Sequence, residues 1–166
     1  TPNMPDAPRP MRRSERAIAA LPDILAILDQ CHALRLGLAG PEGPYVVPLN
    51  FGYEEKEGAL TIFFHCAKAG RKVDMLTVDP RVCFEADCNH KLISGNNPCA
   101  YSLGYESVIG FGKARLLTED ADKSAGLSRI MARFSPAPSF EFEPAVLART
   151  AVYAIDVEHL TGKRHG

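Results

Sequence analysis

The segment 65–72, His-Cys-Ala-Lys-Ala-Gly-Arg-Lys, carries the residue types in this sequence best suited to binding a charged ligand. Lys68, Arg71 and Lys72 fall within five residues, after a strand-like apolar run and at the expected start of a helix. Free amides at a helix N-terminus favour an anion, and Arg and Lys add charge-assisted hydrogen bonds. The small residues around Gly70 would let a ligand approach the backbone. The segment predicts a phosphate cradle, while its pattern alone also fits a solvated basic turn.

His65 stands at the expected end of the strand that contains Ile-Phe-Phe. It could be a hydrogen-bonded structural residue or line a ligand pocket, and no second ligand stands at a spacing that suits a metal. Cys66 follows directly, so the two side chains point to opposite faces of the strand and do not form a nucleophile–base pair. No G-x-S-x-G motif is present either, so no hydrolase arrangement is expected.

A second informative stretch is 44–51, Pro-Tyr-Val-Val-Pro-Leu-Asn-Phe. Proline cannot donate to a strand ladder, so Pro48 predicts an edge strand or a bulge. A ladder broken there would leave backbone groups near Asn50 free to meet the polar edge of a ring. An ordinary edge strand is the alternative interpretation.

A third stretch, 105–114, alternates in the manner of a strand. One face would carry Ser107, Ile109 and Phe111, and the other face Val108, Gly110 and Gly112. The two glycines would permit close approach or strong curvature. A curved barrel strand accounts for the pattern without any ligand.

The elements that must position these residues are mainly strands. Period-2 patterns and β-branched residues predict strands, 3.6-residue patterns predict helices, and Gly, Pro and Asn clusters predict loops. The expected strands are 34–39, 45–53, 59–66, 82–86, 107–117 and 150–157, with 45–66 as a hairpin. The expected helices are 22–32, 70–78 and 119–134, with a long loop at 87–100 and a polar tail at 158–166. This order predicts a mainly β fold, a six-stranded antiparallel barrel with peripheral helices.

Composition narrows the class of protein further. The chain has 166 residues, which suits one domain, 11–166, after a proline-rich and flexible lead-in, 1–10. With 19 basic and 20 acidic residues, neither a nucleic-acid-binding protein nor a polybasic membrane anchor is indicated. Five scattered cysteines without a C-x-x-C pair favour reduced thiols in the cytoplasm over disulfides or zinc.

The ordered set of segments resembles the pyridoxamine 5′-phosphate oxidase-like FMN-binding split-barrel family, and within it the nitroimidazole-resistance branch. The similarity covers nearly all of 11–163. Its segments are Arg12-Arg13, 36–38, 44–51, 64–67 followed by 70–72, 82–85, 105–110 and 161–163.

The resemblance implies a homodimeric split barrel with two flavins at the subunit interface. FMN is the implied cofactor, and FAD remains open. Arg71 and Lys72 would hold the phosphate, and Ser107 would contribute from around the interface. His65 would contact the cofactor or the substrate beside the ring, and would position the substrate or donate a proton. Other cofactor contacts would come from Val47, Pro48, Leu49, Asn50, Cys66 and Ala67. Members of the branch described as nitroimidazole reductases convert a nitro group to an amine.

Two rival functions fit the same barrel. One is a non-catalytic module that stores or senses flavin or haem, for which His159 and His165 are the available haem ligands. The other is an interaction domain without a ligand. The full substrate-phosphate pattern of true pyridoxamine-phosphate oxidases is missing, so that activity is not expected.

Overall fold

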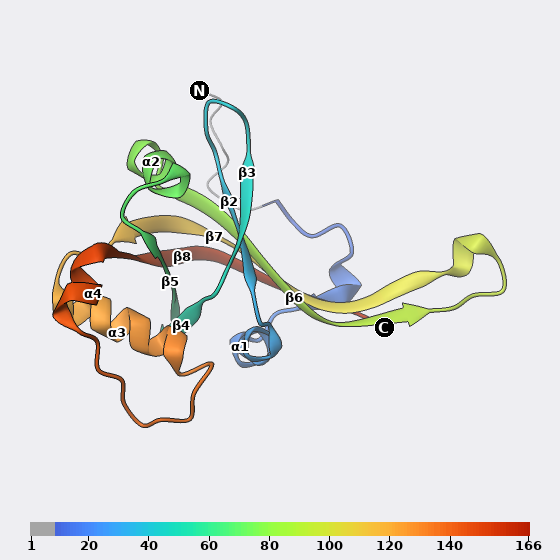
Figure 1. Cartoon of the computed structure of the whole chain (residues 1–166). Coiled ribbons are helices and arrows are strands. Elements are labelled where there is room, and N and C mark those ends of the chain that lie inside the picture. Colours follow the sequence, from blue (N-terminus) through green and yellow to red (C-terminus); the bar gives the residue numbers. More distant parts are fainter. Residues whose placement is uncertain (1–8) are drawn as a thin grey trace.

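The structure is a computed structural model that describes residues 9–166, so most of the predicted lead-in 1–10 lies outside the described residues. Strands dominate it (Figure 1). The strands are β1 (Ala17–Ile18), β2 (Leu34–Leu38), β3 (Tyr45–Leu49), β4 (Gly52–Lys56), β5 (Ala59–Ala67), β6 (Arg81–Ile93), β7 (Ser102–Leu116) and β8 (Thr150–His165). The helices are α1 (Leu21–Gln30), α2 (Arg71–Val78), α3 (Asp120–Met131) and α4 (Pro144–Arg149), with short 3₁₀ turns η1 (Ser14–Arg16) and η2 (Pro98–Ala100).

One antiparallel sheet contains all of these strands, in the order β3-β2-β6-β7-β8-β5-β4, with β1 paired to the far end of β8. The end strands β3 and β4 follow one another in sequence but pair with different partners, β2 and β5. The sheet therefore curls without closing, which confirms the predicted split barrel. It has eight strands instead of six, because β1 was not predicted and the expected strand 45–53 is divided into β3 and β4.

The division between β3 and β4 lies beyond Pro48. Pro48 stays in register opposite Arg35, and pairing continues to Leu49, so the ladder is not broken at the proline. β3 is an edge strand, as its proline predicts. The chain leaves the ladder at Asn50 instead. The predicted hairpin 45–66 is consequently wrong, because this part of the chain belongs to two different hairpins, β2–β3 and β4–β5.

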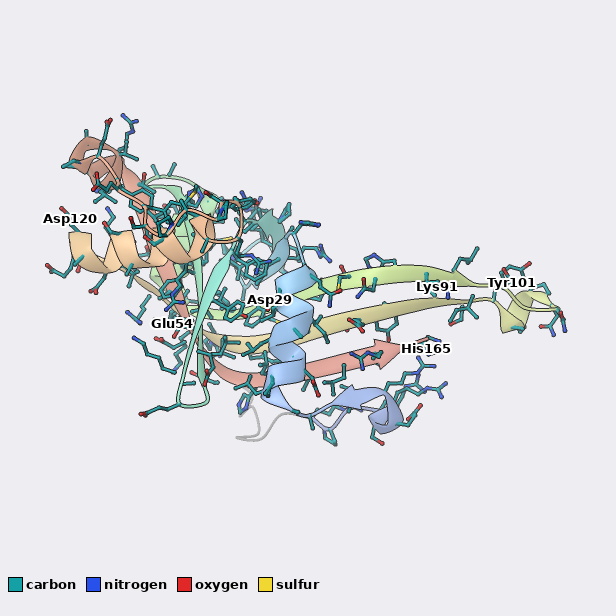
Figure 2. All side chains as sticks on the ribbon, turned by 90° about the horizontal axis from the view of Figure 1, so that it is seen from below. Asp29, Glu54, Lys91, Tyr101, Asp120 and His165 are labelled. Atoms are coloured by element: carbon teal, nitrogen blue, oxygen red, sulfur yellow. The ribbon has the colours of Figure 1, made fainter. Side chains whose placement is uncertain are left out.

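β6 and β7 form a long hairpin arm that projects from the rest of the sheet (Figure 1). Tyr101 near its tip lies well beyond the end of β8 at His165 (Figure 2). The predicted loop 87–100 is therefore wrong over its first half, because Lys91–Ile93 pair with Ser102–Gly104 after a register shift near Asn89, whose φ is +57°. The expected tail 158–166 is also mostly strand. Water reaches much of the surface of both segments, and their residues are correspondingly polar. They therefore lack the alternation of apolar and polar residues from which a strand is predicted.

Successive residues of β5 and β8 face two separate apolar cores. The main core lies inside the curled sheet, around Phe51, Phe64 and Phe84, and the apolar stripe of α1 closes it. A second core lies between the sheet and α3, where Phe63 and Val152 contact the helix residues Leu127 and Ile130. The fold thus places α3 and α4 on the opposite side of β5 from the main core (Figure 1).

Gly110 shows why a glycine is needed in β7. A Cβ atom at this position would lie 2.1 Å from the ring of Phe84, far inside any van der Waals contact. The expected close approach at this glycine is confirmed, and it belongs to the packing of the main core.

Candidate functional site

The segment 65–72 joins the end of β5 to the first turn of α2. Gly70 caps α2 with a φ of +141°, a conformation that favours glycine. Apart from its chain neighbours, no atom of residues 9–166 lies within 4 Å of the position that a Cβ would take there. The amides that begin α2 therefore adjoin open space, as the predicted phosphate cradle requires.

Arg71 connects the first turn of α2 to the β2–β3 turn. Its guanidinium lies 4.4 Å from the centre of the Tyr45 ring and donates a 2.5 Å hydrogen bond to the carboxylate of Glu42. The side chain is about half exposed. Arg71 is therefore held in place on the β3 side of α2 and keeps part of its surface open to a ligand. Neither partner was predicted, because both lie more than 25 residues away in sequence.

Lys72 is half-buried and lies near enough to Cys66 for its charge to act on the thiol. Burial raises the pKa of the Cys66 thiol, and the positive charge of Lys72 opposes that rise. Among residues 9–166, no carboxylate lies within 4.0 Å of the Lys72 ammonium. The structure thus places a cation without a counter-charge beside the start of α2.

His65 is exposed near the end of β5, opposite Val152 of β8. Cys66 is half-buried and partly packed against the main core, so the two side chains lie on opposite faces, as predicted. Asn50 lies between β3 and β4, two residues before Gly52, which pairs with Phe63 two positions before His65. His65 and Asn50 therefore both adjoin the split between the two ends of the sheet.

The other predicted contacts on β3 divide between its faces. Pro48 and Asn50 are exposed, whereas Val47 and Leu49 are half-buried and pack against the main core. Val47 and Leu49 therefore offer a ligand mainly their backbone and the outer edges of their side chains. Ala67 is exposed at the end of β5.

Ser107 does not join the other predicted residues within one chain. It pairs with Lys163, whereas His65 pairs with Val152, and these two partners are 11 residues apart on β8 (163 − 152). At about 3.3 Å per residue this is roughly 35 Å along the strand. Ser107 could contact the same ligand as His65 only from a second copy of the chain.

Ser107 belongs to an exposed surface that combines apolar and charged groups. We call it the outer sheet face; its members include Arg35, Glu85, Asp87, Ile109 and Phe111. The side chain of Arg35 donates hydrogen bonds to Glu85, at 2.8 Å, and to Asp87. Burial raises the pKa of Glu85, the Arg35 hydrogen bond opposes it, and the Asp87 charge adds to it. Ile109 and Phe111 remain 41% and 46% exposed beside this partly buried ion pair.

Residues 22–164 match the model of a family described as pyridoxamine 5′-phosphate oxidase. The chain belongs to the pyridoxamine 5′-phosphate oxidase family. No curated protein sequence matches it significantly.

Solved structures agree with this family. The crystal structure of a candidate 5-nitroimidazole antibiotic resistance protein from Bacteroides thetaiotaomicron is 31% identical, with a TM-score of 0.78 and coverage of 89% of this chain and 86% of that one. A flavocytochrome from Azotobacter vinelandii is 21% identical, with a TM-score of 0.80 and coverage of 94% and 72%. A protein from Mycobacterium smegmatis that binds FAD and haem is 17% identical, with a TM-score of 0.78 and coverage of 90% and 73%. The last two show the fold alone, and the first confirms the predicted resemblance to the nitroimidazole-resistance branch.

Two further findings apply to this family member. Within residues 9–166, no group of three or more His, Cys, Asp or Glu side chains is arranged to hold a metal ion. In the same part of the chain, no helix is long and apolar enough to cross a bilayer.

Proposed function

We propose that this chain is a flavin-dependent oxidoreductase that binds FMN at the segment 65–72. The observation that carries the proposal is the pair Arg71 and Lys72 at the start of α2, directly after Gly70 and its open surroundings. Two cations and the free amides of a helix N-terminus suit a doubly negative phosphate. The site adjoins the split of the barrel, where an aromatic ring could lie along the exposed edge of β3.

The arrangement assigns distinct tasks to the residues of the chain. Arg71 and Lys72 would hold the phosphate, and the contacts of Arg71 with Tyr45 and Glu42 would keep its guanidinium oriented before the cofactor arrives. The backbone near Asn50 would face the polar edge of the ring. A bound flavin would supply the electron transfer, while the protein supplies orientation and electrostatics.

His65 is proposed as the catalytic residue. It is exposed at the split and held by the β5–β8 ladder, so it could orient a small electron-poor substrate over the ring or donate a proton to it. The proposed substrate is a nitroaromatic compound of the 5-nitroimidazole type, because the 31% identical structure is described in those terms.

We also propose a homodimer in which each flavin lies between two subunits. This assembly would bring Ser107 of one subunit towards the segment 65–72 of the other and would cover the exposed apolar groups of the outer sheet face. It explains why one chain alone leaves Ser107 far from His65.

A haem-binding role is less well supported by this chain. His159 and His165 lie six residues apart on β8 (165 − 159), about 20 Å along the strand, so they cannot ligate one haem together. His165 also shares a 2.9 Å hydrogen bond with Ser102. Flavin storage without catalysis remains the second candidate, and the experiment on His65 below separates it from catalysis.

The first prediction concerns the phosphate. Changing both Arg71→Glu and Lys72→Glu should weaken FMN binding at least 100-fold, because two charge-assisted hydrogen bonds are replaced by repulsion. Titration of FMN fluorescence measures this. Lys56→Glu, an exposed cation on β4, is the matched control and should leave FMN affinity unchanged. Unchanged affinity in the double variant would contradict the assignment.

The role of His65 is tested on the same preparations. Protein loaded with FMN is reduced chemically without oxygen and mixed with a 5-nitroimidazole, with three reduced flavins supplied per nitro group. His65→Ala should retain FMN affinity but lose nitro-group reduction, measured as loss of nitro absorbance. Equal rates in the variant and the unchanged protein would exclude a catalytic role for His65. No reduction by either protein, with FMN still bound, would favour storage.

A further inference from the structure

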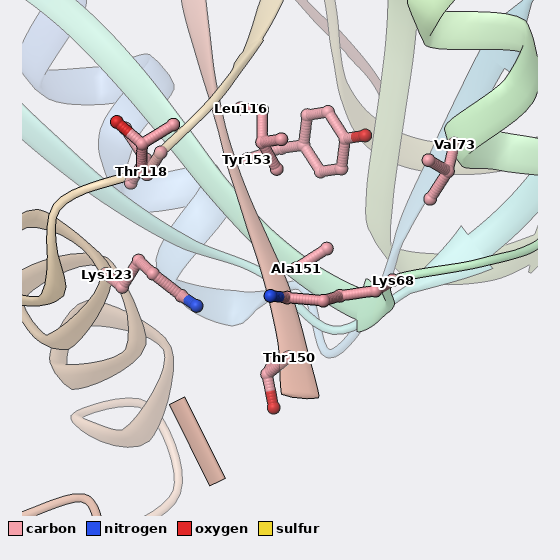
Figure 3. Close-up of a pocket in the computed structure, with 9 residues that line it drawn as sticks. Lys68, Val73, Leu116, Thr118, Lys123, Thr150, Ala151 and Tyr153 are labelled. Atoms are coloured by element: carbon pink, nitrogen blue, oxygen red, sulfur yellow. The ribbon is translucent and has the colours of Figure 1, made fainter. Parts of the chain in front are cut away.

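A hollow of about 280 Å³ lies on the β8 side of the segment 65–72, between the loop after β5, the end of β7, the start of β8 and α3 (Figure 3). Its polar lining consists of two lysines and two threonines. The lining residues that the argument uses are Lys68, Lys123, Thr118, Thr150, Leu116 and Tyr153. Of the three cations in the predicted phosphate cradle, Lys68 alone is among its lining residues. Arg71 instead contacts Tyr45 and Glu42.

Lys123 is the most informative residue of this hollow. It is only 5% exposed, and it is the one charged residue among the fully buried residues of 9–166. Its ammonium donates to the carbonyl of Leu147 in α4. Within the described chain, no carboxylate lies within 4.0 Å of that ammonium. An ammonium has three donors, so one carbonyl leaves a buried cation incompletely bonded and without a counter-charge, which is energetically costly.

Lys68 approaches the same hollow from the opposite wall. Figure 3 shows the ammonium groups of Lys68 and Lys123 directed towards one another from the loop after β5 and from α3. Lys68 also has no carboxylate within 4.0 Å among residues 9–166. Two like charges that converge on one space repel each other, and an anion between them would add two attractive interactions that outweigh this repulsion.

The remaining walls indicate what kind of anion fits. Leu116 and Tyr153 present apolar surface, and Thr118 adds a hydroxyl group that can donate a hydrogen bond to an oxyanion. The hydroxyl of Thr150 already donates to the carbonyl of Val146, at 2.7 Å. A volume of about 280 Å³ falls just below the roughly 300–1,000 Å³ typical of pockets for drug-sized ligands. The occupant should therefore be smaller than a flavin and should combine one anionic group with a small apolar body.

We propose that this hollow is a second ligand site, which binds a small organic oxyanion, a carboxylate or a phosphate ester with an apolar body, between Lys68 and Lys123. It is separate from the cofactor cradle because Lys68 and Arg71 leave the segment 65–72 on different sides. The proposal stands whether or not the chain binds FMN.

Calorimetric titration with phenyl phosphate, benzoate and the neutral benzamide tests the site. Phenyl phosphate or benzoate, or both, should bind saturably with one equivalent per chain, and the tighter of the two identifies the preferred anionic group. Benzamide should bind at least tenfold more weakly. Lys68→Met and Lys123→Met should each weaken anion binding about tenfold or more, because each removes a charged hydrogen-bond donor.

Four comparisons can overturn the proposal. Arg71→Met and saturation with FMN should both leave anion binding unchanged; loss of binding in either case would place the anion in the cofactor cradle and overturn the proposal. Equal binding of benzamide, or full anion binding by Lys68→Met, would overturn it as well. Lys123→Met also loses the bond to Leu147 and can fail to fold for that reason. Lys68→Met changes an exposed residue, so it keeps the test valid in that case.

Discussion

Arg133 is half-buried just beyond α3 and connects elements that are far apart in sequence. Its guanidinium donates to the carbonyl of Leu28, at 3.0 Å, and to that of Cys31, both at the end of α1. It also lies 4.1 Å from the centre of the Phe51 ring. Burial lowers the pKa of Arg133, against the attraction of Asp29. One side chain thus completes the C-terminus of α1 and covers the aromatic ring that follows β3.

Replacing Arg133 should therefore destabilise the fold substantially. Arg133→Met removes charged hydrogen bonds to two carbonyls, which should lower the free energy of unfolding by about 2–3 kcal/mol. Urea denaturation measures the change. Arg129→Met, which breaks only an exposed ion pair with Glu54, is the control, and its cost should stay within about 1 kcal/mol. Equal effects of the two variants would show that Arg133 is not a structural link.

Residue types alone predicted part of the site. The cations of 65–72 and the opposite orientations of His65 and Cys66 follow from local pattern. Lys123 gave no such signal, because a lysine near the start of a polar helix normally lies in water. Its burial results from the packing of α4 against α3, which joins residues 24 positions apart.

At the scale of elements, the packing of α3 on β4 depends on Gly52. A Cβ at this position would lie 2.4 Å from the backbone of Arg129 in α3. The helix backbone can approach the strand this closely only because no side chain intervenes. The position of α3 in turn sets one wall of the hollow between Lys68 and Lys123.

Gly52→Ala should consequently force α3 away from the sheet. Overpacking of this kind costs about 1–3 kcal/mol, and urea denaturation should show a loss in that range. Gly37→Ala in β2 is the matched control, since the atom nearest to its Cβ would be the carbonyl oxygen of Cys83, at 3.3 Å. A control variant that loses more stability than Gly52→Ala would refute the close packing of α3.

The elements that were predicted wrongly have a common physical origin. The arm beyond Cys88 and the end of β8 are held by cross-strand hydrogen bonds and bury little apolar surface. Apolar and polar residues alternate along a strand only where one face of it is buried. Strands without a buried face therefore cannot be predicted from this pattern. Helices α1 to α3 were predicted within a few residues, because each buries an apolar stripe.

At the scale of the whole molecule, the outer sheet face is the surface that we expect to contact a partner. Ile109 and Phe111 are large and exposed beside the ion pair of Arg35 and Glu85. Exposed apolar groups of this size, rimmed by polar residues, are typical of interaction surfaces. The proposed homodimer would cover them and would place Ser107 beside the partner's cofactor.

Light scattering after size exclusion tests the dimer. The unchanged protein should have twice the 18.1 kDa mass of the chain. Phe111→Glu should produce monomers, because it places a charge at the centre of the covered surface. Phe134→Glu, at an exposed position just after α3, should remain dimeric. A monomer at every concentration of the unchanged protein would refute the proposed assembly.

The sequence by itself determined the mainly β class, the principal helices, the cation-rich start of α2 and the face on which each residue of 105–114 lies. These features depend on residues close together in the chain, where periodicity and residue type directly set conformation and burial. Only the tertiary structure decided that β3 and β4 separate at Asn50, that Lys68 and Lys123 converge, and that Ser107 is far from His65. These relations depend on strand register and helix packing between distant segments, which no local pattern encodes.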